Sequence, residues 1–117
     1  MAEERFQLLP GTLELLVLRV LLRGELHGYE IASAIQQRSK DVLQIEEGSL
    51  YPALHRMEKR GWIDATWGLS ESNRRAKYYA LTKKGRSEYT AQSENWERVS
   101  GAVANVLRAH SSSGAIG

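Results

Sequence analysis

The chain has 117 residues, a net charge of +2 and no cysteine. This length predicts one domain with a modest core, and the lack of cysteine excludes disulfide bonds, thiolate nucleophiles and cysteine-based zinc sites. The longest apolar stretch, residues 13–22, is short and contains Glu14 and Arg19, so no membrane span is predicted, and no signal peptide is recognisable. We therefore expect a cytoplasmic protein with no metal site and no cofactor.

The basic residues are concentrated in the middle of the chain. Between His55 and Arg86 there are nine Lys and Arg side chains against three Asp and Glu, a net charge of +6, so the remainder carries −4. Such a distribution is typical of a protein that binds a polyanion. A solvated charged face gives the same composition, so charge alone leaves both interpretations open.

The first helix is expected over residues 12–23, after an amphipathic lead-in at residues 1–9, with Thr12 as its N-cap. Its apolar residues form two faces, which predicts a helix buried on two sides. In so small a chain we expect the second side to meet another subunit. The first face holds Leu13, Leu16, Val17, Val20 and Leu21, and the second holds Leu15, Leu18 and Leu22.

A second helix is expected over residues 29–40, followed by a connector at residues 41–47. Part of the connector could pair briefly as a strand. The inward residues of this helix are expected to be Tyr29, Ile31, Ala32 and Ile35, and the strand would use Val42, Leu43 and Ile45.

The third helix combines an apolar stripe with a basic, aromatic outer face. Leu50, Leu54 and Met57 follow helical spacing and predict a buried stripe. Ser49 is expected to be the N-cap, Pro52 to lie in the first turn, and Gly61 to end the helix. A helix of this kind can lie in a DNA major groove while a core holds its back. The outward residues are Tyr51, His55, Arg56, Lys59 and Arg60.

A β-hairpin is expected next, with strands at residues 62–67 and 74–81 and a turn-rich tip between them. The last helix then begins after Thr82 as N-cap and runs to about Ala109. Its apolar residues alternate three and four apart, as in a heptad stripe. A dimer seam and a helix packed back on its own domain both give this pattern. The stripe holds Tyr89, Trp96, Val99, Val103 and Val106, and His110 would continue it.

The order of elements predicts a mainly α fold with a small β-hairpin, a winged helix-turn-helix plus a long C-terminal dimerisation helix. We expect residues 1–82 to form the DNA-binding domain, residues 83–110 the dimerisation helix, and residues 111–117 a disordered tail.

Four segments in this order resemble the PadR family of transcriptional regulators. They are residues 26–31 (LHGYEI), 48–58 (GSLYPALHRME), 61–63 (GWI) and 77–85 (KYYALTKKG), and the single helix that follows resembles the short subfamily. The resemblance implies a homodimeric repressor that binds operator DNA. It also implies dimerisation through the C-terminal helix, packed against the partner's first helix, and in many members a small aromatic or cationic effector.

Candidate DNA contacts follow from the third helix and the hairpin. Hydroxyls of Ser49 and Tyr51 can donate to phosphates, and the family pattern places Tyr51 and Pro52 at the DNA surface. His55 and Arg56 could reach base edges. Phosphate or minor-groove contacts are expected from Lys59, Arg60, Arg74, Arg75 and Lys77. Two alternatives stay open, that Tyr51 is a half-buried packing residue and that His55 is simply exposed.

The seam has a second potential role. Two copies of Trp96 near a two-fold axis, with Val99 beside them, could hold a flat aromatic or cationic effector; alternatively Trp96 only fills space. The predicted dimer interface holds Leu15, Leu18, Leu22, Tyr89, Trp96, Val99, Val103 and Val106.

Other functional classes find little support in the sequence. None of the common hydrolase, metalloprotease or nucleotide-binding motifs is present, so no enzyme is expected. His27 and Glu30 form an i, i+3 pair of the kind that is more often structural. The alternative function is a winged-helix protein–protein interaction module without sequence-specific DNA binding, which would favour an apolar or acidic surface over a basic one.

Overall fold

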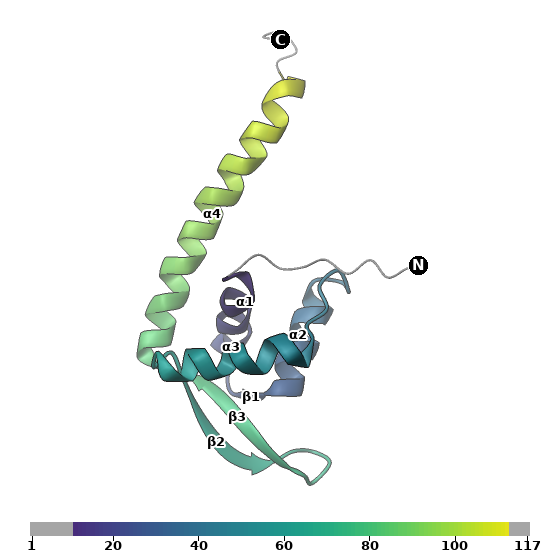
Figure 1. Ribbon diagram of the computed structural model, residues 1–117, viewed down its shortest axis with the longest axis vertical. Coiled ribbons are helices and arrows are strands. Elements are labelled where there is room, and N and C mark those ends of the chain that lie inside the picture. The colour runs from purple at the N-terminus through teal and green to yellow at the C-terminus, as the bar shows by residue number, and fades with distance from the viewer. Residues whose placement is uncertain (1–10, 113–117) are drawn as a thin grey trace.

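The computed structural model describes residues 11–112. Three helices form a compact head, a hairpin extends from one side of it, and the long last helix projects from the other (Figure 1). The predicted lead-in at residues 1–9, the side chain of His110 and residues 113–117 of the predicted tail lie outside the described part. The helices are α1 (Thr12–Val20), a 3-10 turn η1 (Leu21–Arg23), α2 (Gly28–Arg38), α3 (Glu47–Lys59) and α4 (Lys83–Ser112), and the strands are β1 (Leu26–His27), β2 (Ile63–Leu69) and β3 (Arg75–Leu81).

A three-stranded antiparallel sheet contains the predicted hairpin. β3 lies in the centre, with β2 on one side and β1 on the other, and Tyr79 pairs with Ala65 and with Leu26. The prediction of a short strand in the connector was wrong, because no strand lies between α2 and α3. Val42 is exposed there, while the side chains of Leu43 and Ile45 pack against the core. The third strand is instead β1, whose two residues are too few to leave an alternation in the sequence.

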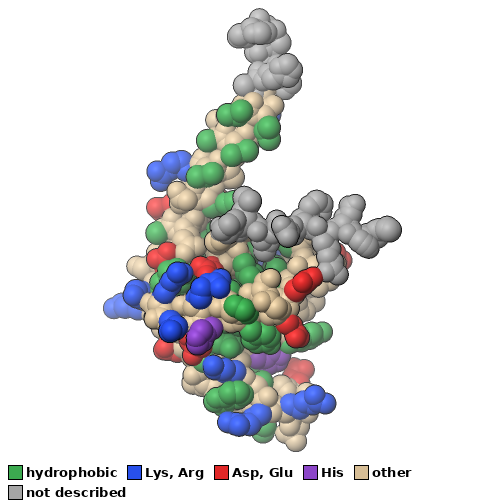
Figure 2. Space-filling view, in the orientation of Figure 1, with side chains coloured by type: hydrophobic (Ala, Val, Ile, Leu, Met, Phe, Trp, Pro, Cys, Tyr) green, Lys and Arg blue, Asp and Glu red, His purple; other side chains and the backbone are tan. Residues whose placement is uncertain are grey.

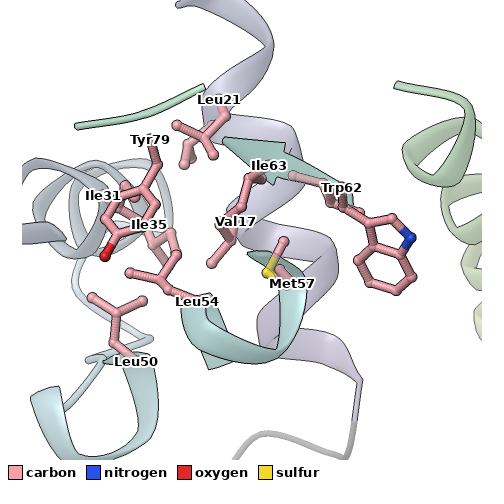
Figure 3. Packing of buried hydrophobic residues seen from close by; sticks show 12 residues of the cluster. Val17, Leu21, Ile31, Ile35, Leu50, Leu54, Met57, Trp62, Ile63 and Tyr79 are labelled. Carbon is pink, nitrogen blue, oxygen red and sulfur yellow. The ribbon is translucent and has the colours of Figure 1, made fainter. Parts of the chain in front are cut away.

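The core is built on the apolar stripe of α3. Leu50, Leu54 and Met57 are buried as predicted, each with 1% exposure or less. They face Val17 of α1 and the strand residue Ile63 across the interior (Figure 3). Burying each such side chain contributes about 1.5–3 kcal/mol, so this stripe fixes how α3 is rotated on the domain.

Two burial predictions were wrong. Leu18, expected on a face that meets another subunit, has no exposed surface within its own chain, because α1 packs against α2, α3 and α4 together. Tyr29, expected in the core, is 75% exposed at the start of α2. Leu15 and Leu22 are half-buried and keep some surface.

The helix starts differ from those expected at two places. α1 begins at Thr12 itself, with Gly11 as the N-cap at φ 88°, and α3 begins at Glu47 with Glu46 as the N-cap. Ser49 is therefore the third residue of α3, and Pro52 lies in its second turn. Because proline has no N–H, the carbonyl of Gly48 lacks its usual i+4 donor there.

Thr82 caps α4 as predicted and also ties the helix to the head. The Thr82 hydroxyl accepts a hydrogen bond from the Gly85 N–H at 2.9 Å and donates one to the Gly61 carbonyl oxygen at 2.7 Å. Gly61, at φ 79°, ends α3 as expected. The same side chain thus joins the end of α3 to the start of α4, which runs to Ser112, three residues beyond the expected end.

Two glycines of α4 give a matched test of this junction. A methyl group at Gly85 would overlap the Trp62 carbonyl oxygen, whereas Gly101 has open space around it. We expect Gly85→Ala to lower the free energy of unfolding by more than about 2 kcal/mol. Gly101→Ala should raise it by about 0.5–1 kcal/mol, since alanine favours the helix. Urea denaturation measures both, and equal effects would contradict the packing described.

Candidate nucleic-acid interface

Half of the predicted contact residues line a groove between α3 and the hairpin, here called the wing groove. It encloses about 1040 Å³ and is lined from the start of α2, the outer face of α3 and the hairpin. Tyr51, His55, Arg74, Arg75 and Lys77 all line it. The other predicted contacts, Ser49, Pro52, Arg56, Lys59 and Arg60, are exposed on α3 outside this lining.

Tyr51 lies over the start of α2. A methyl group at Gly28 would overlap the Tyr51 ring and hydroxyl, so the glycine is what allows the ring to pack there. Tyr51 is nevertheless 44% exposed. The packing role considered for Tyr51 is therefore present, and the ring still offers one side to the wing groove.

His27 begins α2 as the N-cap of a capping box. Its ring Nδ1 accepts from the backbone N–H of Glu30 at 3.3 Å, while the backbone N–H of His27 donates to the Glu30 carboxylate at 3.0 Å. The ring also meets the edge of Tyr78, with 5.3 Å between ring centroids. The structural interpretation of the His27–Glu30 pair is thus confirmed.

Aromatic rings hold the cations of the hairpin on the groove side. The Arg75 guanidinium lies 4.5 Å from the centroid of Trp67, and Lys77 Nζ lies 5.9 Å from that of Tyr79. Lys77 also donates to the Glu58 carboxylate at 3.5 Å, which links the hairpin to α3. Sequence reasoning missed Trp67, although its alternation with Ile63 along β2 places both on one face.

A carboxylate of α1 engages two arginines of α3. Arg56 Nε lies 3.2 Å from Glu14 Oε2, and Arg60 lies 3.5 Å from Glu14 Oε1. Glu14 itself is only 8% exposed. Arg56, for which the sequence predicts a role in base reading, is therefore paired with a nearly buried carboxylate while its side chain stays about half exposed. Nothing in the sequence pattern indicated Glu14, whose partners are more than forty residues away.

The charge on this surface is divided. Figure 2 shows Lys and Arg side chains over the C-terminal half of α3 and over the hairpin, with acidic side chains at the other end of α3. The acidic end corresponds to Glu46 and Glu47, beside the exposed Ser49. Phosphate attraction is therefore strongest at the end of α3 and at the hairpin.

Two tyrosines of β3 have raised pKa values, Tyr79 in the lining of the wing groove and Tyr78 beside it in sequence. Burial, with a contribution from the charge of Glu58, raises the pKa of Tyr79. Desolvation followed by the charges of Glu30 and Glu25 raises the pKa of Tyr78, whose hydroxyl donates to the Leu69 carbonyl at 3.0 Å. Because both pKa values are raised from about 10, both hydroxyls stay protonated at neutral pH.

The distal part of α4 carries an apolar stripe that no other segment of residues 11–112 covers. Trp96, Val99, Val103 and Val106 are 43–74% exposed, and Leu107 adds another exposed side chain. A groove of about 360 Å³ runs from Trp96 and Val99 to Leu15 of α1. Tyr89, expected in the seam, packs instead against the core of its own chain, because α4 crosses α1 at that level.

Residues 11–112 show neither a metal-binding cluster nor a membrane-spanning helix. That range holds no group of three His, Cys, Asp or Glu side chains arranged for a metal ion. It also holds no helix that is both long and apolar enough to cross a membrane.

A family profile and two sequence relatives match this chain. A profile described as the transcriptional regulator PadR-like family matches residues 17–91. An uncharacterised protein of Lysinibacillus sphaericus is 32% identical over 95 residues, covering 81% of this chain and 87% of the relative. A transposon protein of Streptomyces fradiae is 36% identical over 90 residues, but the chain spans only 24% of its length.

Two solved structures of transcriptional regulators are also similar to this chain. A transcriptional regulator from Clostridium thermocellum is similar with a TM-score of 0.73 and 32% identity, covering 80% of this chain and 88% of that one. A PadR-like transcriptional regulator from Bacillus cereus is similar with a TM-score of 0.70 and 33% identity, covering 83% and 92%.

The raised pKa of Tyr79 predicts a loss of stability at alkaline pH. The folded state holds this proton more tightly than the unfolded chain, so the contribution is complete below pH of about 10 and is lost as the pH rises through the folded value. We expect Tyr79→Phe to unfold with a smaller alkaline decline than the unmodified protein. Urea denaturation at pH values on both sides of the transition measures this, and identical declines would contradict the assignment.

Proposed function

Because the chain belongs to the PadR-like family of transcriptional regulators and is thus a DNA-binding regulator, we propose that it acts as a homodimeric repressor. Each subunit would place α3 in the major groove of an operator and its hairpin against the neighbouring backbone. The observation that carries this proposal is the exposed face of α3 beside the wing groove, where hydroxyl, imidazole and cationic groups gather.

The proposed DNA contacts divide by chemistry. Ser49, Tyr51, Pro52 and His55 lie on the exposed side of α3 and would meet base edges and the nearest sugar–phosphate groups. Phosphate or minor-groove contacts would come from Lys59, Arg74, Arg75 and Lys77. Arg56 and Arg60 are left out of direct base reading, because Glu14 holds both.

The dimer would form along α4. Its exposed stripe needs an apolar cover, and a second copy offers the same stripe related by a two-fold axis. We propose an interface of Trp96, Val99, Val103 and Val106, with Leu15 and Leu22 of α1 contributing their remaining surface. Leu18 and Tyr89 take no part in this proposal, since their own chain packs them.

An effector site is proposed at the same place. The groove beside Trp96 and Val99 lies next to the seam, so a flat aromatic or cationic molecule could stack there between subunits. By changing the distance between the two copies of α3, such a molecule would release the operator. The other interpretation, that Trp96 only fills the seam, predicts no such ligand.

The alternative of a protein–protein interaction module has less support. Its surface would favour apolar or acidic groups, whereas Lys59, Arg74 and Arg75 are exposed cations.

Titration against two duplexes tests the proposal. The DNA upstream of the protein's own gene should bind about a thousandfold or more tightly than a scrambled duplex at physiological salt. Equal, weak binding to both would contradict an operator at that position.

Two variants separate base reading from phosphate binding. Arg74→Ala should weaken binding to all sequences alike. It should also lower the magnitude of the salt slope, which is the slope of log binding constant against log salt concentration, by about 0.9, since one phosphate contact is lost. His55→Ala should instead cost about 1–3 kcal/mol at one operator position and little elsewhere. Fluorescence anisotropy with single-position operator variants measures both. Sequence-independent losses from His55→Ala would contradict its role in base reading.

The seam is tested by a charge in the stripe. Val103→Asp should convert the dimer to monomer, because an aspartate would be buried against its own symmetry mate. Asn105→Asp adds the same charge on the opposite side of α4 and should leave the dimer intact. Sedimentation velocity distinguishes the states. A monomer in the unmodified protein, or a dimer in Val103→Asp, would contradict the proposed interface.

A further inference from the structure

Glu14 is a nearly buried charged residue that is not among the DNA contacts proposed above. Arg56 and Arg60 are one helical turn apart on α3, so their guanidinium groups converge on this single carboxylate. Each of its two oxygens faces a different arginine, at 3.2 and 3.5 Å. The arrangement links α1 to the C-terminal half of α3, where the cations of that helix gather (Figure 2).

The carboxylate and the two arginines of this cluster differ in their exposure to solvent, and therefore in the cost of separating them. The Glu14 side chain is 11% exposed, whereas those of Arg56 and Arg60 are 53% and 52% exposed. An arginine that leaves the carboxylate is readily hydrated, but the buried carboxylate is then left without its counter-charge. A DNA phosphate that draws one of these arginines away therefore removes part of the counter-charge of a nearly buried carboxylate.

We propose that Glu14 is a positioning residue for DNA discrimination, which holds Arg56 and Arg60 away from phosphates. Arginine–phosphate contacts strengthen binding to every sequence alike. By restraining two of the three cations at the end of α3, Glu14 limits sequence-independent affinity and leaves discrimination to the remaining exposed face. The inference rests on the DNA surface proposed above, but it concerns binding to any duplex.

Glu14→Gln tests the inference, with Glu94→Gln as the control. Both variants remove one negative charge, and Glu94 is exposed on α4, whereas the carboxylate that pairs with the two arginines is Glu14. On a scrambled duplex, we expect Glu14→Gln to steepen the salt slope by about 1–2 relative to the control. Between roughly 50 and 200 mM salt, this corresponds to an additional loss of affinity of about four- to sixteenfold. Equal slopes for the two variants would overturn the inference.

The arginines themselves provide a second, independent test. The double variant Arg56→Gln, Arg60→Gln should barely change the salt slope of the otherwise unmodified protein, because Glu14 already keeps both arginines from contacting phosphates. The same pair of changes should cancel the added slope in Glu14→Gln. A fall of about 2 in the unmodified background would overturn the inference, since the arginines would then already be contacting phosphates. Thermal unfolding of each variant checks that the fold is retained.

The result for Glu14 can be distinguished from the result for the proposed operator binding. A protein that fails to distinguish its upstream DNA from the scramble contradicts the operator proposal, while the slopes on the scramble still decide the role of Glu14.

Discussion

The packing of α3 against the head is the constraint on which the rest of the structure depends. Leu50, Leu54 and Met57 are essentially without exposed surface, and they face α1 and the start of β2. Because helical periodicity is fixed, burying this stripe determines which residues of α3 point outward. The wing groove, the basic end of α3 and the site of the Glu14 cluster are all consequences of that one rotation.

Much of the fold could be predicted because its signals are local. Apolar periodicity identified the helices and hairpin, and Thr82 was recognisable as a cap. β1 was missed, since two residues owe their strand geometry to pairing with Tyr79 and Tyr78 of β3 and not to their own pattern. Ser49 was misjudged as an N-cap because the helix begins earlier, at Glu47, where no side chain marks the start.

The candidate site was predictable in its residues and less so in their partners. Periodicity shows that Arg56 points away from the stripe of α3, but not that a carboxylate of another helix lies within reach. Likewise, the sequence pattern shows that Leu18 is buried but does not show whether its own chain or a second copy buries it. Distances between helices far apart in sequence decided both cases, and they are properties of the packed domain.

The central claim is that the exposed face of α3 meets DNA twice, once from each subunit of a dimer. Hydroxyl-radical footprinting on the upstream DNA tests this most directly. The account predicts two protected regions on one side of the duplex, about one helical turn or 34 Å apart, or a multiple of that spacing. One protected region, or protection spread evenly over the fragment, would contradict it.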